Sequence, residues 1–83
     1  MKVEVLLFAQ LKEMFGKDRL FFDVEEGARV ETVVERLMGE SSLPRWRDFP
    51  LLYAVNENFV SEKAVLRERD TLALMMPVSG GST

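Results

Sequence analysis

The residues with the clearest chemical potential lie at the end of the chain, where Gly80 and Gly81 precede Ser82 and Thr83. Glycine has no Cβ and wide φ/ψ freedom, so a glycine pair lets a chain end enter a narrow enzyme cleft without steric clash. The chemistry that such a tail offers is that of a backbone carboxyl group. The alternative interpretation is a flexible terminus made of small residues.

Histidine and cysteine are both absent from the chain. Without cysteine there is no disulfide, no thiolate nucleophile and no cysteine-based metal site, so any sulfur that the protein handles must come from another molecule. Without histidine the usual general base and the commonest zinc ligand are missing. We therefore expect no catalysis by this chain alone, and neither a cofactor nor a metal bound to it.

The composition fits one small domain of 83 residues, 47% of them hydrophobic. No apolar stretch is long enough to cross a bilayer, and the acidic Glu4 interrupts the start of any signal peptide, so we expect a cytoplasmic protein without membrane contact. The net charge of −3 argues against binding to nucleic acid. The basic and aromatic cluster of Arg45, Trp46 and Arg47 is interpreted as a loop with a tucked tryptophan.

The first half of the chain predicts a strand over 2–9, a short helix over 10–15 that ends at Gly16, and a second strand over 20–24. Alternation in the first strand divides it into two faces, which are Val3, Val5 and Leu7 against Lys2, Glu4, Leu6 and Phe8.

A second helix is predicted from Val30 to Met38, because apolar residues recur there at helical spacing, and Gly39 closes the run. Arg29 is a poor N-cap residue, which leaves the exact start of this helix open.

The second half predicts a loop over 40–50, a strand over 51–55, a turn over 56–58, a short return strand from 59, a charged turn over 67–70 and a last strand over 71–76. Alternation places Leu72 and Leu74 on one face of that last strand and Met75 on the other. Met75 and Phe8 should therefore point away from the core. The order of elements predicts an α+β fold in which a mixed sheet of about five strands packs on one main helix, with a domain over 1–77 and a flexible tail over 78–83.

Three segments carry a resemblance to a known family: Leu-Phe-Ala-Gln-Leu-Lys-Glu at 7–13, Ala-Val-Asn-Glu-Asn-Phe-Val at 54–60, and Pro-Val-Ser-Gly-Gly at 77–81. In this combination and spacing the chain resembles the small subunits of molybdopterin synthase, the MoaD-type sulfur carriers, over nearly its whole length. The resemblance implies a β-grasp, ubiquitin-like fold.

The resemblance also implies a mechanism centred on Gly81, with Gly80 before it. An adenylyltransferase partner similar to ubiquitin-activating enzymes would use ATP and magnesium to turn the Gly81 carboxylate into an acyl adenylate. A persulfide donor would then supply the sulfur of a terminal thiocarboxylate. In the large subunit of molybdopterin synthase this sulfur would pass to cyclic pyranopterin monophosphate.

For partner binding, the resemblance points to an apolar patch made by Phe8, Phe59 and Met75. It adds the basic Lys12 near the same surface, and Pro77 and Val78 at the base of the tail. The alternatives are that the three apolar residues are ordinary sheet residues under the loop that holds Trp46, and that Lys12 lies on a solvated helix face.

The chain departs from the family pattern at three places. Ser82 and Thr83 follow the second glycine, so Gly81 has no free carboxyl group unless they are removed. A precursor trimmed by a peptidase and residues left from cloning or from a truncated fusion are the favoured accounts, and a relative that lost carrier function is the third. Leu-Met-Met-Pro at 74–77 replaces a more aromatic segment, and the turn at 68–70 lacks the glycine often found there.

Two other functions stay open from the sequence. A sulfur carrier of the thiamine thiazole type would share the fold and the diglycine. A ubiquitin-like protein modifier or a plain interaction module would use the same fold for another purpose.

Overall fold

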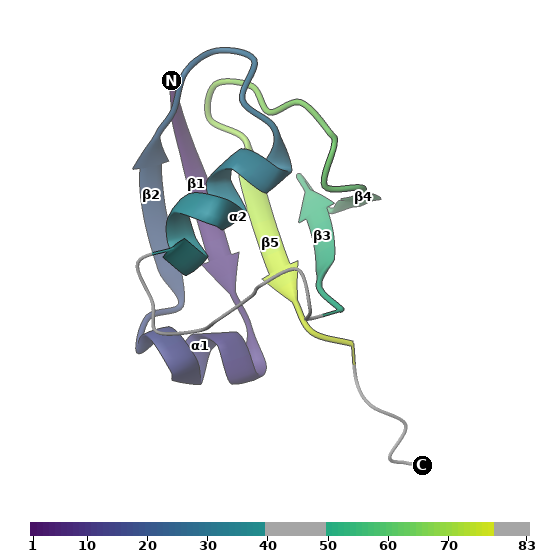
Figure 1. Cartoon of the computed structure of the whole chain (residues 1–83). Helices are drawn as coiled ribbons and strands as arrows, with labels where there is room; N and C mark the ends of the chain where they lie inside the picture. Colours follow the sequence, from purple (N-terminus) through teal and green to yellow (C-terminus); the bar gives the residue numbers. More distant parts are fainter. Residues whose placement is uncertain (40–49, 78–83) are drawn as a thin grey trace.

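The computed structural model describes residues 1–39 and 50–77, which form a five-stranded mixed sheet with a helix across one face (Figure 1). In chain order, the elements of these residues are β1 (Lys2–Leu7), α1 (Ala9–Phe15), β2 (Arg19–Asp23), α2 (Val30–Gly39), β3 (Leu52–Val55), β4 (Asn58–Val60) and β5 (Thr71–Met75). No helix in this described part of the chain is long and apolar enough to cross a membrane.

The strands lie side by side in the order β2-β1-β5-β3-β4. The central pair, β1 and β5, is parallel, whereas β1–β2, β3–β5 and β3–β4 are antiparallel. Strands from the two ends of the chain therefore meet in the middle of the sheet, and α2 lies across them (Figure 1). The predicted α+β architecture of the β-grasp type is confirmed.

The core lies between α2 and one face of the sheet. Val3, Val5 and Leu7 of β1 are buried, as the alternation predicts. The predicted stripe of α2 is buried as well, over Val30, Val33, Val34, Leu37 and Met38. Leu72 and Leu74 of β5, Leu11 of α1 and Leu66 complete the fully enclosed part of this cluster.

The boundary between β1 and α1 differs from the prediction. The strand ends at Leu7, and Phe8 is the N-cap of α1 with extended φ and ψ of −122° and 151°. Ala9 has a φ of 51°, in the left-handed region that alanine rarely adopts. The chain thus leaves the sheet after Leu7, two residues earlier than predicted, because the turn into α1 needs this backbone conformation. The other boundaries that can be compared differ by at most one residue.

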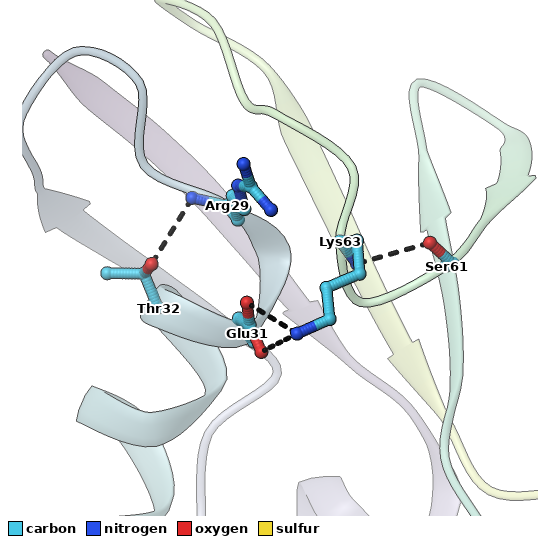
Figure 2. A network of polar contacts seen from close by, with 5 residues as sticks. All are labelled: Arg29, Glu31, Thr32, Ser61 and Lys63. Carbon is cyan, nitrogen blue, oxygen red and sulfur yellow. Dashed lines mark hydrogen bonds and ion pairs between the residues drawn. The ribbon is translucent and has the colours of Figure 1, made fainter.

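The start of α2 is fixed at Val30 although Arg29 is a weak N-cap residue. The Oγ1 of Thr32 accepts a hydrogen bond of 3.2 Å from the backbone N–H of Arg29, which is one half of a capping box (Figure 2). The N–H groups of Val30 and Glu31 donate to the carbonyl groups of Ala64 and Glu62, both at 3.0 Å. These partners satisfy helix-start donors that would otherwise lack an acceptor.

Segment 61–66 is held against the start of α2 by its own contacts (Figure 2). The Nζ of Lys63 lies 3.2 Å from Oε1 of Glu31, and the Lys63 N–H donates to the Oγ of Ser61 at 3.1 Å. The Leu66 N–H donates to the Ala28 carbonyl at 2.8 Å, and Leu66 is buried. The connection between β4 and β5 is therefore anchored to the helix.

Asn56 links the β3–β4 turn to the start of β5. Its Oδ1 accepts from the backbone N–H of Thr71 at 3.0 Å, and its Nδ2 donates to Oδ1 of Asp70 at 2.9 Å. The Asn56 N–H donates to the Thr71 carbonyl at 2.9 Å. The asparagine of the Ala-Val-Asn segment thus has a structural role in this chain.

Two predicted segments lie outside the described residues. One is residues 40–49 of the predicted loop, including Arg45, Trp46 and Arg47. The other is the predicted tail over 78–83, including Val78, Gly80 and Gly81.

Candidate docking face and the base of the tail

The face of the sheet away from α2 carries a row of apolar side chains. Residues paired in register share a face, and the pairs Leu6–Ala73, Ala73–Ala54 and Ala54–Phe59 run across β1, β5, β3 and β4. The pair Leu52–Met75 lies beside this row on the same face. We define the outer patch by these residues: Leu6, Leu52, Ala54, Phe59, Ala73 and Met75.

Exposure within the outer patch is concentrated at its β3–β4 end. The Phe59 residue is 72% exposed and Leu52 is 41% exposed. Met75 is half-buried on the β5 strand between them and β1. Large exposed apolar residues grouped on one face are typical of protein–protein contact sites.

Phe8 and Lys12 lie at the end of the sheet beside this patch. Both line a hollow of about 370 Å³ together with Leu6 of the outer patch and Arg19 of β2. Phe8 is 46% exposed, and the side chain of Lys12 is on the open surface of α1. Leu6 therefore connects the surroundings of Phe8 and Lys12 with the outer patch.

The base of the tail lies at the same end of the sheet as this hollow. Pro77 is exposed and follows Met76, whose side chain packs partly against the core after the last residue of β5. In Figure 1, β5 ends near α1, and the described chain stops just beyond it. The roles predicted for Val78, Gly80 and Gly81 stay predictions, because these residues lie outside the described part of the chain.

The predicted placement of Phe8 and Met75 outside the core agrees with the structure, and Phe59 is exposed on the same sheet face as Met75. Leu52 and Ala54 were not predicted as members of this face. Residues 51–55 are all apolar or aromatic, so that strand shows no polar alternation from which the two faces could be read. Leu51 is buried whereas Leu52 is exposed, and the pairing of Leu52 with Met75 shows that Leu52 lies on the outer face.

Charged residues border the outer patch on its β1 side. The Glu4 carboxylate lies between the Nε of Arg19 at 2.9 Å and the Oγ1 of Thr71, which donates to it at 3.1 Å. Both contacts cross neighbouring strands on the outer face, next to the row of Leu6 and Ala73. An apolar centre with a polar border is the usual anatomy of an interface.

Residues 1–39 and 50–77 contain no cluster of three or more histidine, cysteine, aspartate or glutamate side chains arranged to hold a metal. The described residues place exposed apolar side chains, Phe59 and Leu52 among them, on the sheet face that also carries Met75 near the base of the tail. A family model described as the ThiS family matches residues 5–81. The chain belongs to the ThiS family.

Named relatives show which members of the ThiS family this chain resembles. The molybdopterin synthase sulfur carrier subunit of Arabidopsis thaliana is 32% identical over 81 residues, which cover 96% of this chain and 83% of the relative. The resemblance predicted from the three sequence segments is therefore confirmed. The ThiS match ends at Gly81, so Ser82 and Thr83 lie outside it.

Solved structures agree with the fold. The crystal structure of SAMP1 from Haloferax volcanii is 28% identical, with a TM-score of 0.83 over 98% of this chain and all of that one. One chain of the complex of subunits 1 and 2 of molybdopterin-converting factor from Helicobacter pylori is 23% identical. It has a TM-score of 0.69 over 98% of this chain and all of that one, a similarity of fold.

Proposed function

We propose that this chain is a sulfur carrier, the small subunit of a molybdopterin synthase. The observation that carries this proposal is the similarity to a molybdopterin synthase sulfur carrier subunit over 96% of the chain. The outer patch beside the base of the tail supports it through its exposed residues Phe59 and Leu52, because a carrier must bind its partners while its end reaches their active sites.

The working group of the carrier is the carboxylate of Gly81. A free carboxylate is a poor electrophile with a poor leaving group, so the partner adenylyltransferase first joins it to AMP with release of pyrophosphate from ATP. The outer sulfur of a persulfide donor then displaces AMP at the acyl carbon and forms an acyl disulfide. A second thiol attacks the donor's sulfur in that bond, which leaves a disulfide on the donor side and releases the thiocarboxylate. This soft nucleophile forms the carbon–sulfur bonds of the dithiolene, and two carrier turnovers supply its two sulfur atoms.

The large subunit and the adenylyltransferase bind the same face in this proposal. Phe59, Leu52 and Met75 supply the apolar contact, and Phe8 and Lys12 extend it around the hollow at the end of the sheet. Pro77 and Val78 then direct the tail into the partner. ATP and magnesium belong to the activating partner, and this chain binds neither.

Ser82 and Thr83 must be removed before Gly81 is activated. The ThiS match that ends at Gly81 supports this position as the functional end. A peptidase that cleaves after Gly81 would complete the carrier. Its action would produce the free carboxylate that adenylation requires.

The test is the intact mass of a chain ending at Gly81 after incubation with the adenylyltransferase, ATP and a sulfide source. A gain equal to the exchange of oxygen for sulfur is expected, and the 83-residue chain serves as the control that should stay unmodified. If the chain ending at Gly81 forms neither adenylate nor thiocarboxylate, the proposal is wrong.

A protein modifier is the second candidate, favoured by the similarity to the Haloferax volcanii SAMP1, a small archaeal modifier protein. A modifier would form isopeptide bonds between Gly81 and lysines of other proteins. A ladder of conjugates that disappears when Gly81 is deleted would support it. Sulfur transfer without such a ladder would support the carrier alone.

A further inference from the structure

Strand β2 forms one edge of the sheet and pairs, within the described residues, with β1 alone. An edge strand offers backbone N–H and C=O groups to another strand. The sequence of β2, Arg-Leu-Phe-Phe-Asp, has opposite charges at its two ends and an aromatic residue at its centre. These features make the edge complementary to a second copy of itself.

The hydrogen bonds at the two ends of the β1–β2 ladder show which backbone groups are available. The Leu7 N–H donates to the Asp18 carbonyl at 3.0 Å, and the Val24 N–H donates to the Met1 carbonyl at 2.8 Å. Because antiparallel ladders alternate, Leu20 and Phe22 direct their backbone groups toward β1. Arg19, Phe21 and Asp23 direct theirs toward the open edge, and the Arg36 guanidinium donates to the Asp23 carbonyl there.

The side chains of the same three residues lie on the outer face. Their partners in register are Leu6, Glu4 and Lys2, which belong to that face. Phe21 is 61% exposed, and Arg19 and Asp23 are exposed on either side of it. Leu20 and Phe22 point to the other face, where they pack partly against the core.

We propose that two copies of this chain associate through antiparallel pairing of their β2 strands, with the twofold axis at Phe21. In this register Phe21 pairs with Phe21 of the second copy, Arg19 with Asp23, and Leu20 with Phe22. Phe21 forms the hydrogen-bonded pair at the centre, because its N–H and C=O both face the edge. The two sheets join into one, with both α2 helices on the same side.

Two existing contacts are compatible with this arrangement. Arg19 is paired with Glu4 at 2.9 Å, but a guanidinium has five N–H donors and can also serve the incoming Asp23 carboxylate. Arg36, whose guanidinium lies 5.4 Å from the centre of the Phe22 ring, uses one lone pair of the Asp23 carbonyl. The second lone pair stays open to an N–H from the other copy.

The proposal does not depend on the carrier function. β2 and β4 are opposite edges of the sheet, so the pairing leaves Phe59 accessible. Arg19 contacts the second copy in this arrangement and also lines the hollow with Phe8 and Lys12. One short strand per copy makes a small interface, and the association should be weak and reversible.

The first experiment is sedimentation velocity of the full chain over a concentration series, with the variants Arg19→Glu and Asp23→Lys. The unmodified chain should dimerise. Each variant places like charges opposite one another and should weaken dimerisation roughly tenfold. A mixture of the two variants restores opposite charges in both pairs, so a heterodimer should form. A monomer at all concentrations, or a mixture no tighter than its components, would overturn the proposal.

The second experiment tests the register by crosslinking. The chain has no cysteine, so Phe21→Cys introduces a single thiol at the twofold axis. The Cα separation of about 5.5 Å in a hydrogen-bonded pair is within the range of a disulfide. Mild oxidation should give a covalent dimer, whereas Phe59→Cys at the opposite edge should crosslink much more slowly. Equal crosslinking of the two variants would contradict pairing through β2.

Discussion

At the scale of single residues, Asn56 combines two properties that few side chains share. Its φ of 50° lies in the left-handed region, which asparagine tolerates, and its amide bonds both Asp70 and the backbone of Thr71. The sequence marks this residue as part of a family motif. The geometry shows that it joins the β3–β4 turn to the beginning of β5.

Two substitutions of Asn56 should therefore separate the stability that its side-chain hydrogen bonds contribute from the stability that its tolerance of a positive φ contributes. Asn56→Gly keeps the backbone conformation but loses the side-chain hydrogen bonds, at a cost of about 1 kcal/mol. Asn56→Ala should cost about 2 kcal/mol, because alanine also resists a positive φ. Chemical denaturation of both variants measures the difference. Equal losses would show that the backbone conformation contributes nothing.

Glu57, the next residue, has a φ of 74° in the same turn. Asparagine followed by glycine is the preferred pair for a hairpin with two left-handed residues. Glu57→Gly should stabilise the protein by roughly 0.5 to 1 kcal/mol. Glu57→Ala removes the same side chain without relieving the backbone, and it should give no such gain in the midpoint of thermal unfolding.

At the scale of elements, α2 shows what a sequence pattern does and does not predict. The apolar stripe of the helix is predictable, because it depends only on spacing along the chain. Its start is not, because the acceptors for the N–H groups of Val30 and Glu31 come from the carbonyls of Ala64 and Glu62. These acceptors reach the helix only after the chain has folded.

The contribution of the hydrogen bond at the start of α2 can be tested at Thr32. Thr32→Ala removes the acceptor of the Arg29 N–H and should cost about 1 kcal/mol of stability. Thr32→Ser keeps the hydroxyl group and should retain most of it. Lys63→Ala, which breaks a pair whose lysine side chain is 62% exposed, should cost under about 0.5 kcal/mol. Urea unfolding of the three variants gives the ranking, and a larger loss for Lys63→Ala than for Thr32→Ala would contradict it.

At the scale of the whole molecule, the outer patch is assembled from four strands and from both halves of the chain. Alternation within β5 is enough to predict that Met75 lies off the core. Phe8 also lies off the core, but as the N-cap residue of α1 beyond the end of β1, so the alternation predicted its exposure from a strand that does not reach it. It is not enough for Leu52 and Ala54, because their side of the sheet depends on the register between β3 and β5. The roles of the remaining site residues are predicted from the sequence alone; these residues are Val78, Gly80 and Gly81.

Docking of the large subunit through the outer patch can be tested at Phe59. Phe59→Ala should weaken binding of the large subunit about tenfold to thirtyfold, because truncating a large aromatic anchor of an interface commonly costs about 2 kcal/mol. The stability of the Phe59→Ala variant should match that of the unmodified chain, since Phe59 is 72% exposed. Phe21→Ala is the matched control on the same face at the opposite edge. Calorimetric titration that finds equal losses for both variants would contradict docking through the outer patch.

The parallel pairing of β1 and β5 has a mechanical consequence. The chain enters the sheet at the start of β1, and it leaves at the far end of β5, the strand directly beside it. A pull on the tail with the first strand held would therefore load all the hydrogen bonds between these strands together in shear, instead of opening them one after another. A partner that grips and withdraws the end of this chain would thus pull against the most resistant direction of the fold.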